Sequence, residues 1–163
     1  MNEVATTAGC KLGSLKLIVL THGDFDHTGN AAYLRHKYAI KIAMHFDDSG
    51  MLKRGDMFWN RKKGNMLIGM IVPLLSGFTK SDRSTHDLPL PGQSKSSIGI
   101  LTAGGDLFCG DLLINVGKPA LNDIIDDVAV ANASVERLKS LNIQTVYPGH
   151  GKPFPMELFI IYH

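Results

Sequence analysis

Short apolar runs separated by polar segments mark the first third of the chain. Residues 15–20 form a nearly continuous apolar run, which is typical of a strand buried on both faces. Helix-forming residues with apolar side chains at helical spacing follow over 30–38, and the alternation over 39–44 predicts a second strand. A strand, a helix and a strand in this order predict that the two strands pair in parallel.

The middle of the chain is less regular. Residues 47–60 predict a short helix and a loop, and residues 66–75 predict an apolar helix that Pro73 ends. This apolar stretch is far shorter than the roughly 20 residues that a membrane helix needs, so we expect no membrane partner. Residues 1–13 have small side chains and little periodicity, which predicts a weakly ordered or short helical lead-in.

The second half of the chain is rich in predicted strands. Alternating or apolar runs predict strands over 87–90, 97–102, 107–109 and 143–147. The glycine-rich residues 103–106 predict a hairpin turn between the second and third of these strands. The longest helix is expected over 123–140, because one apolar stripe runs through Ile124, Val128, Ala131, Val135 and Leu138.

Composition narrows the class of protein. The 163 residues, of which 44% are hydrophobic, predict one domain over 1–163 with a hydrophobic core. The formal net charge is +2 and the one basic cluster is 61–63, so we expect no nucleic-acid partner. Two widely separated cysteines suggest no disulfide framework, and the N-terminus lacks the pattern of a signal peptide. A cytoplasmic location is therefore the expectation.

Histidine and aspartate side chains gather where predicted strands end. Because open α/β sheets bind ligands beyond the carboxyl ends of their strands, we expect such side chains to converge. Histidine and carboxylate together suit zinc, and they also bind iron or manganese. A helix-capping loop, a turn aspartate and a surface histidine stay open as alternative explanations of the three segments involved. The candidates are His22, Asp24, Asp26, His27, Asp111 and His150.

Four segments of the chain resemble a known family. In their order and spacing, THGDFDHTGN, PGQSKSSIGI, LFCGDLL and VYPGHG resemble the metallo-β-lactamase superfamily, especially its glyoxalase II-like hydrolases. The resemblance covers the chain from about Leu15 to Phe154. It implies an α/β fold, the αββα sandwich of that family. Since the first candidate ligand is already His22, it also implies that the first strands of the N-terminal sheet are missing.

The resemblance divides the candidate ligands into two groups. The group that we call the second is incomplete. In it, His22 matches a family histidine, but Asp24 and Gln93 stand where the family has two further histidines. Asp24 keeps an oxygen that suits harder ions, whereas Gln93 offers only a neutral carbonyl oxygen, which is a weak ligand. The first group has every ligand that the resemblance implies: Asp26, His27, Asp111 and His150.

The resemblance also implies a reaction. A metal-bound hydroxide would attack a small ester, thioester, lactone or phosphoester, with one or two zinc ions, or manganese or iron, as the cofactor. Asp26 and Asp111 would be the catalytic carboxylates, and the substrate-binding residues stay unassigned. Loss of two histidines favours a non-catalytic metal- or ligand-binding relative as an alternative. The short N-terminus favours an assembly subunit that completes its sheet with a partner chain, and we expect a homodimer.

Overall fold

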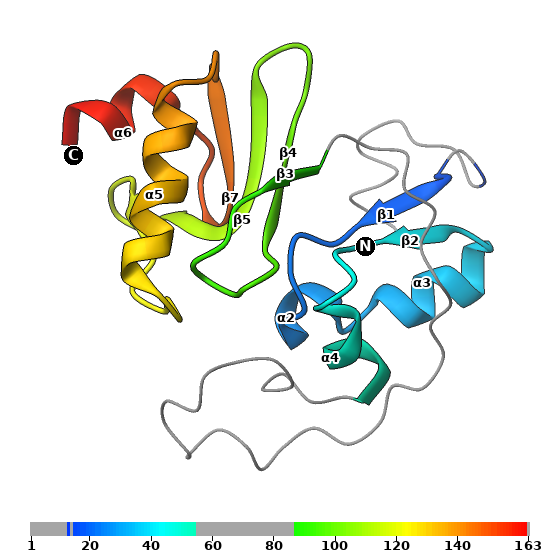
Figure 1. Cartoon of the computed structure of the whole chain (residues 1–163). Coiled ribbons are helices and arrows are strands. Elements are labelled where there is room, and N and C mark those ends of the chain that lie inside the picture. The colour runs from blue at the N-terminus through cyan, green and yellow to red at the C-terminus, as the bar shows by residue number, and fades with distance from the viewer. Residues whose placement is uncertain (1–12, 14, 55–86, 163) are drawn as a thin grey trace.

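A computed structural model of the chain describes residues 13, 15–54 and 87–162 (Figure 1). The lead-in before Gly13 and the apolar helix expected over 66–75 therefore lie outside the described residues. The strands are β1 (Leu17–Val19), β2 (Lys41–Ala43), β3 (Asp87–Pro89), β4 (Ile98–Leu101), β5 (Asp106–Asn115), β6 (Ala120–Leu121), β7 (Thr145–Gly151) and β8 (Phe154–Pro155). The helices are α2 (Phe25–Thr28), α3 (Ala31–Tyr38), α4 (Ser49–Arg54), α5 (Val128–Lys139) and α6 (Met156–Tyr162).

Strands β1 and β2 form a two-stranded parallel sheet, with Val19 opposite Ala43. Helix α3 lies between them in the sequence, so the predicted strand–helix–strand order and the parallel pairing are confirmed. The helix ends at Tyr38, and its C-cap residue Ala39 has a left-handed φ of 52°, which turns the chain back toward β2. The N–H of Leu20 continues the pairing by donating to the carbonyl oxygen of Ala43 at 2.9 Å. The paired backbone thus leads directly into the histidine-rich segment.

Strand β5 is the centre of a six-stranded sheet, in which the order is β3-β4-β5-β7-β8 and β6 also pairs with β5. The predicted hairpin joins β4 to β5, and the N–H of Thr102 closes it by donating to the carbonyl oxygen of Asp106 at 2.9 Å. Strand β7 runs parallel to β5 and is bonded along most of it. This pairing brings Asp111 of β5 and His150 of β7 to the same end of the sheet.

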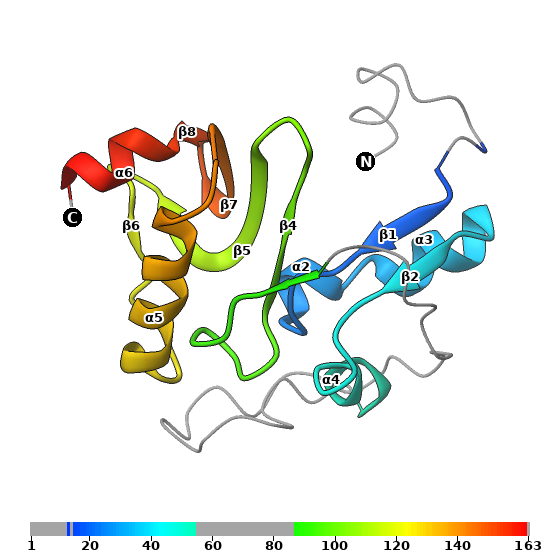
Figure 2. The same cartoon turned by 45° about the horizontal axis from the view of Figure 1, so that its top comes forward.

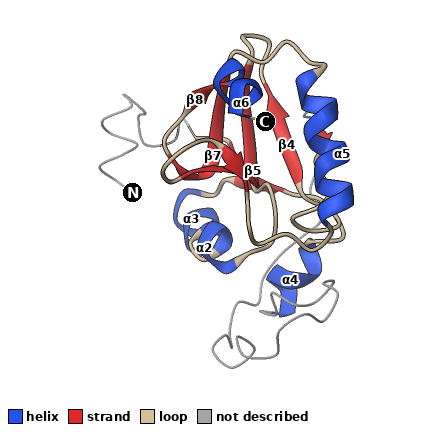
Figure 3. Ribbon diagram, turned by 90° about the vertical axis from the view of Figure 1, so that its left-hand side faces the viewer, coloured by secondary structure: helices blue, strands red, loops and turns tan. Residues whose placement is uncertain are grey.

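Helices cover the six-stranded sheet on one side. Figures 1 and 2 show α5 and α6 on that side, and β1, β2 and helices α2–α4 on the other. Figure 3 looks at the sheet from the side of α5 and α6. Ala131, Val135 and Leu138 of α5 pack with Leu107 and Leu112 of β5 in the main core. In the described part of the chain, no helix is long and apolar enough to cross a membrane.

The predicted start of the long helix is wrong. Helix α5 begins at Val128 rather than at residue 123, because the side chain of Asp127 caps it by accepting a hydrogen bond from the N–H of Val130. Ile124 therefore precedes the helix and is 72% exposed, and Val128 in the first turn is 58% exposed. Neither residue belongs to the buried stripe to which its spacing assigned it.

Two predicted strand ends are also wrong. Strand β5 was expected to end at Cys109, before Gly110, and β7 at residue 147, but β5 continues through Asp111 and β7 through His150. The pairing of the two strands shifts register on either side of Gly110, so the glycine marks an irregularity inside a strand and not its end. Two candidate ligands consequently lie within paired strands, which hold them more firmly than loops would.

Candidate metal centre

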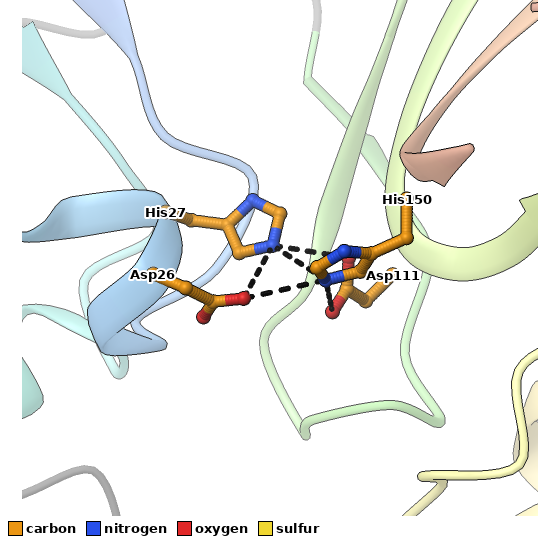
Figure 4. A group of neighbouring side chains, drawn as sticks. All are labelled: Asp26, His27, Asp111 and His150. Atoms are coloured by element: carbon orange, nitrogen blue, oxygen red, sulfur yellow. Dashed lines mark hydrogen bonds and ion pairs between the residues drawn. The ribbon is translucent and has the colours of Figure 1, made fainter. Parts of the chain in front are cut away.

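The segment after β1 forms a helical turn, α2, where the sequence predicted a loop. Asp24 is its N-cap residue, and the N–H groups of His27 and Thr28 both donate to the Asp24 carbonyl oxygen. The side chain of Asp24 makes no capping hydrogen bond to this helix, so a capping role does not explain its carboxylate. The turn directs the side chains of Asp26 and His27 toward β5 and β7 (Figure 4).

Four side chains from three elements converge at this point: Asp26, His27, Asp111 and His150 (Figure 4). One potential ligand atom from each lies within 4.8 Å of the others. The Nε2 atom of His27 is 3.2 Å from Asp111 Oδ1 and 3.4 Å from His150 Nε2. His150 Nε2 is 3.3 Å from Oδ2 of Asp26 and 3.3 Å from Oδ2 of Asp111. Two imidazole nitrogens and two carboxylates that meet in this way form a donor set that fits a divalent cation.

Two glycines leave the space in which these side chains meet. A Cβ atom at Gly149 would overlap Oδ1 of Asp111 and would lie 2.8 Å from Cε1 of His27. Gly110 has a φ of 54°, and a Cβ there would lie 2.6 Å from Oγ1 of Thr21. Each glycine thus permits the close approach of two strands to the segment after β1.

A second, more deeply buried group contains His22, Asp24 and Asp111. The Nε2 atom of His22 lies 3.6 Å from Oδ2 of Asp24 and 3.8 Å from Oδ2 of Asp111. His22 is 1% exposed, and among the described residues its Nε2 makes no hydrogen bond, while its Nδ1 is 3.0 Å from Oγ1 of Thr21. Leaving such a buried polar atom unsatisfied costs about 1–3 kcal/mol, and a cation bound there would recover this cost.

Gln93 lies beside this second group and directs its amide nitrogen toward it. Its Nε2 donates to Asp24 Oδ2 at 2.9 Å, and its Oε1 accepts a hydrogen bond from Ser97 Oγ at 2.9 Å. In this orientation Gln93 offers Asp24 a hydrogen-bond donor rather than the weak oxygen ligand that the sequence predicted. The amide thus satisfies an oxygen of a buried carboxylate.

The charges of the site shift the pKa values of its histidines in opposite directions. The hydrogen bond to Asp111 raises the pKa of His27 above its usual 6.5, although burial opposes the shift. Burial lowers the pKa of His22, although nearby carboxylates oppose it. Burial disfavours the charged form of Asp111, but the hydrogen bond from His27 and the neighbouring histidine charges outweigh it, so the pKa of Asp111 is lowered. A neutral His22 and an ionised Asp111 are the forms that bind a cation.

Residues that the sequence did not single out lie around the site. Asn122 Nδ2 donates to the backbone oxygen of Asp111 at 3.0 Å, which holds that part of β5 in place. Asp48 is 1% exposed and accepts a hydrogen bond from Ser94 Oγ at 3.2 Å. The serine-rich segment 94–97, directly before a buried strand, was a signal for such a contact. Asp48 had no signal, because it lies at the start of a segment that predicted only a short helix and a loop.

All six residues predicted as ligands are thus brought together, in two groups that share Asp111. The profile of the Metallo-beta-lactamase superfamily matches residues 3–150 of the chain. The chain is 27% identical over 145 residues to "Hydroxyacylglutathione hydrolase 1" of Vibrio vulnificus (strain YJ016), a match that covers 84% of this chain and 49% of that protein. The chain therefore spans about half the length of this curated relative.

Solved structures resemble the whole described fold. The crystal structure of TTHA1623 in a di-iron-bound form has a TM-score of 0.68 and 27% sequence identity, and the match covers 96% of this chain and 79% of that one. A metallo-beta-lactamase from Pontibacter korlensis has a TM-score of 0.69 at 14% identity, covering 98% of this chain and 71% of that one. The second likeness concerns the fold alone.

Proposed function

The chain belongs to the metallo-beta-lactamase superfamily, and from this premise we propose that it is a metal-dependent hydrolase of a small ester, thioester, lactone or phosphoester. One observation carries the proposal: potential ligand atoms of Asp26, His27, Asp111 and His150 lie within 4.8 Å of one another. The same four residues are the set that the sequence resemblance implies, and they come from segments far apart in the chain.

In this proposal the four residues hold the first cation, and His22, Asp24 and Asp111 form a weaker second position. A bound divalent cation lowers the pKa of a coordinated water molecule toward neutrality and polarises the substrate oxygen. The lowered pKa of Asp111 keeps its carboxylate ionised, which balances the charge of the cation. Asp111 contributes to both positions because its Oδ1 lies near His27 and its Oδ2 lies near His22 and His150.

Asp26 is the proposed residue that orients the attacking water. Its side chain is 40% exposed and that of His150 is 47% exposed, whereas the side chain of Asp111 is only 9% exposed. The accessible side of the group is therefore the side of Asp26 and His150, from which water and substrate would approach. Oδ2 of Asp26 would accept a hydrogen bond from the water there and aim its lone pair at the substrate.

A thioester is the substrate class that we place first. The curated relative from Vibrio vulnificus is named as a hydrolase of a hydroxyacylglutathione, which is a thioester. Because the chain covers 49% of that relative, the shared class of substrate is a proposal for this chain. Esters, lactones and phosphoesters stay as alternatives, since each presents an electrophilic centre with an oxygen that a cation polarises.

Zinc is the metal that we propose for the first position, where two imidazoles join two carboxylates. Iron and manganese are the alternatives, because carboxylate-rich sites suit harder ions and the relative TTHA1623 was crystallised in a di-iron-bound form. Asp24, which replaces a nitrogen ligand by an oxygen, shifts the second position in the same direction.

The test combines metal content with hydrolysis. We expect about one or more equivalents of metal per chain and hydrolysis of a glutathione thioester, measured beside an aryl ester, a lactone and a phosphodiester. A chelator should abolish the activity, and the added metal should restore it. Asp111→Ala should lower both metal content and activity at least about tenfold, whereas the exposed Asp47→Ala should change neither. A purified protein that holds less than half an equivalent of metal, unchanged by Asp111→Ala, would refute the proposal.

A binding protein without hydrolase activity is the second candidate function. The hydrogen bond from Gln93 Nε2 to Asp24 favours it, because an amide nitrogen occupies a contact that a cation would otherwise make. Metal bound at the first group without turnover of any of the four substrate classes would support this candidate.

We also propose that the protein forms a homodimer and that it lies in the cytoplasm. The support for the dimer is the two-stranded sheet of β1 and β2, which pairs with no other strand among the described residues and leaves Leu17 36% exposed. Size-exclusion chromatography with light scattering should give twice the mass of one chain. A stable monomer would contradict the dimer and leave the hydrolase proposal untouched.

A further inference from the structure

A row of buried side chains links Asp48 to Asp24. The hydroxyl of Ser94 lies 3.2 Å from Asp48 Oδ2 and 2.8 Å from the hydroxyl of Ser97. Ser97 Oγ lies 2.9 Å from Oε1 of Gln93, whose Nε2 lies 2.9 Å from Asp24 Oδ2. All five residues are buried. Neither the proposed reaction nor the family resemblance assigns a role to Asp48, Ser94 or Ser97.

The row has one donor hydrogen atom fewer than it has contacts between side chains. Four contacts join its five members in sequence. A carboxylate only accepts, each serine hydroxyl donates one proton, and a carboxamide donates only at the end that carries its nitrogen. Ser94, Ser97 and Gln93 therefore supply three donors for four contacts, and one contact must lack a hydrogen bond.

The orientation of the Gln93 amide decides which contact this is. With the nitrogen toward Asp24, Ser97 donates to Gln93. Ser94 can then donate to Asp48 or to Ser97, but not to both. With the amide turned over, its nitrogen donates to Ser97, Ser97 donates to Ser94, and Ser94 donates to Asp48. The missing hydrogen bond then lies between Gln93 Oε1 and Asp24 Oδ2, where two oxygen atoms face each other.

Two facing oxygens beside His22 are the arrangement that a cation requires. The Nε2 atom of His22, which makes no hydrogen bond among the described residues, is 3.6 Å from the same Asp24 Oδ2. We propose that the row from Asp48 to Asp24 is a hydrogen-bond switch that couples the Gln93 amide to the second cation position. Without a cation the amide nitrogen faces Asp24, and with a cation the amide turns and its carbonyl oxygen becomes a ligand.

Asp48 is the positioning residue of this switch, although it does not touch the cation position. Because its carboxylate only accepts, Ser94 donates to Asp48 and has no hydrogen left for Ser97. Ser97 can then donate to Ser94 and accept from the Gln93 nitrogen, which favours the turned amide. The isosteric change Asp48→Asn reverses this preference, because the new amide donates to Ser94, Ser94 to Ser97 and Ser97 to Gln93. Every contact in the row is then satisfied with the Gln93 nitrogen on Asp24, so the second position is closed.

The inference rests on the proposed metal binding, and its test separates the two. Metal-free protein is titrated with zinc ions, and the affinities of the first and second ions are measured by calorimetry. Asp48→Asn should weaken the second ion about fivefold to tenfold, the factor expected for one hydrogen bond, and leave the first unchanged. Ser96→Ala is the matched control: Ser96 donates to the other oxygen of Asp48, outside the row, so both affinities should be retained.

A second variant keeps the test decisive if Asp48→Asn folds poorly. Gln93→Glu presents oxygens in either orientation, so it should strengthen the second ion and remove its dependence on residue 48. The side-chain NH2 resonance of Gln93, identified by its loss in this variant, should shift when the second ion binds to wild-type protein. The switch is overturned if Asp48→Asn leaves the affinity of the second ion unchanged, or if the Gln93 NH2 resonance does not shift when the second ion binds. Failure to bind even one ion overturns the proposed function as well.

Discussion

The imidazole of His27 and the carboxylate of Asp111 meet at 3.2 Å between Nε2 and Oδ1, and this contact joins the segment after β1 to the centre of the six-stranded sheet. The hydrogen bond between them raises the pKa of His27 and contributes to lowering that of Asp111. The two halves of the candidate site therefore stabilise each other's charged forms in the metal-free protein.

This contact predicts a pH dependence of metal-free stability. Because the pKa of His27 is raised in the folded state, its contribution is fully present below the usual 6.5 and is lost as pH rises through the raised value. Because the pKa of Asp111 is lowered, its contribution is present above the usual 3.8 and is lost as pH falls through the lowered value. In chelator-treated protein, His27→Gln should therefore cost more stability at pH 5.5 than at pH 8.5, measured by urea unfolding.

His22 supplies the contrast for that measurement. Its pKa is lowered by burial, so its protonation opposes folding as pH falls below 6.5. His22→Gln should then lose less stability at pH 5.5 than at pH 8.5, the reverse of His27→Gln. Equal pH profiles for the two variants would show that the assigned environments are incorrect.

Gly149→Ala should damage the site without unfolding the sheet. Its Cβ would overlap Asp111 Oδ1, so the carboxylate must move away from His27. We expect metal affinity to fall at least about tenfold, because a displaced ligand is as costly as a lost supporting contact. Gly117→Ala is the control, since a Cβ there has nothing within 4 Å. Calorimetric metal titration of both variants is the measurement, and equal affinities would contradict the prediction.

Asn122→Ala should remove a hydrogen bond that holds the backbone of Asp111 in position. Asn122 donates to the backbone oxygen of Asp111 and accepts from the N–H of Ile124, so the change removes two hydrogen bonds. A loss of about 1–3 kcal/mol in unfolding free energy is expected. Metal affinity should fall about tenfold as well, as for other residues that support a ligand. The exposed Asn132→Ala should do neither, and an Asn122→Ala protein with unchanged metal affinity would show that β5 holds Asp111 unaided.

Removal of metal should lower the melting temperature. A cation present at about 100 times its dissociation constant stabilises the folded state by about 2.7 kcal/mol, if it does not bind the unfolded chain. For a chain of this size that corresponds to a shift of roughly 5–11 °C, since about 1 kcal/mol shifts the midpoint by about 2–4 °C. Differential scanning calorimetry with zinc and with chelator measures it. Asp111→Ala should melt at one temperature under both conditions.

Much of the fold followed from local patterns. The parallel pair around α3 and the hairpin between β4 and β5 were predicted, because periodicity and turn residues act over a few positions. The start of α5 was missed, because the helix begins where the Asp127 side chain accepts a capping hydrogen bond from the N–H of Val130, although the apolar spacing continues before that point. The continuation of β5 past Gly110 was missed, because a glycine that permits close packing looks the same in sequence as one that ends a strand.

The sequence by itself determined which residues are the candidate metal ligands. The spacing of His22, Asp24, Asp26 and His27 after an apolar run is a local property, and it predicted a group that the structure brings together with Asp111 and His150. Only the tertiary structure decided which contacts surround Asp24, and in them Gln93 directs nitrogen, not oxygen, to its carboxylate. These are contacts between distant segments, and the direction of each hydrogen bond depends on which donors and acceptors the packing leaves within reach. In the proposed switch, cation binding at the second position depends on the protons of Ser94, Ser97 and Gln93, which no spacing of residues records.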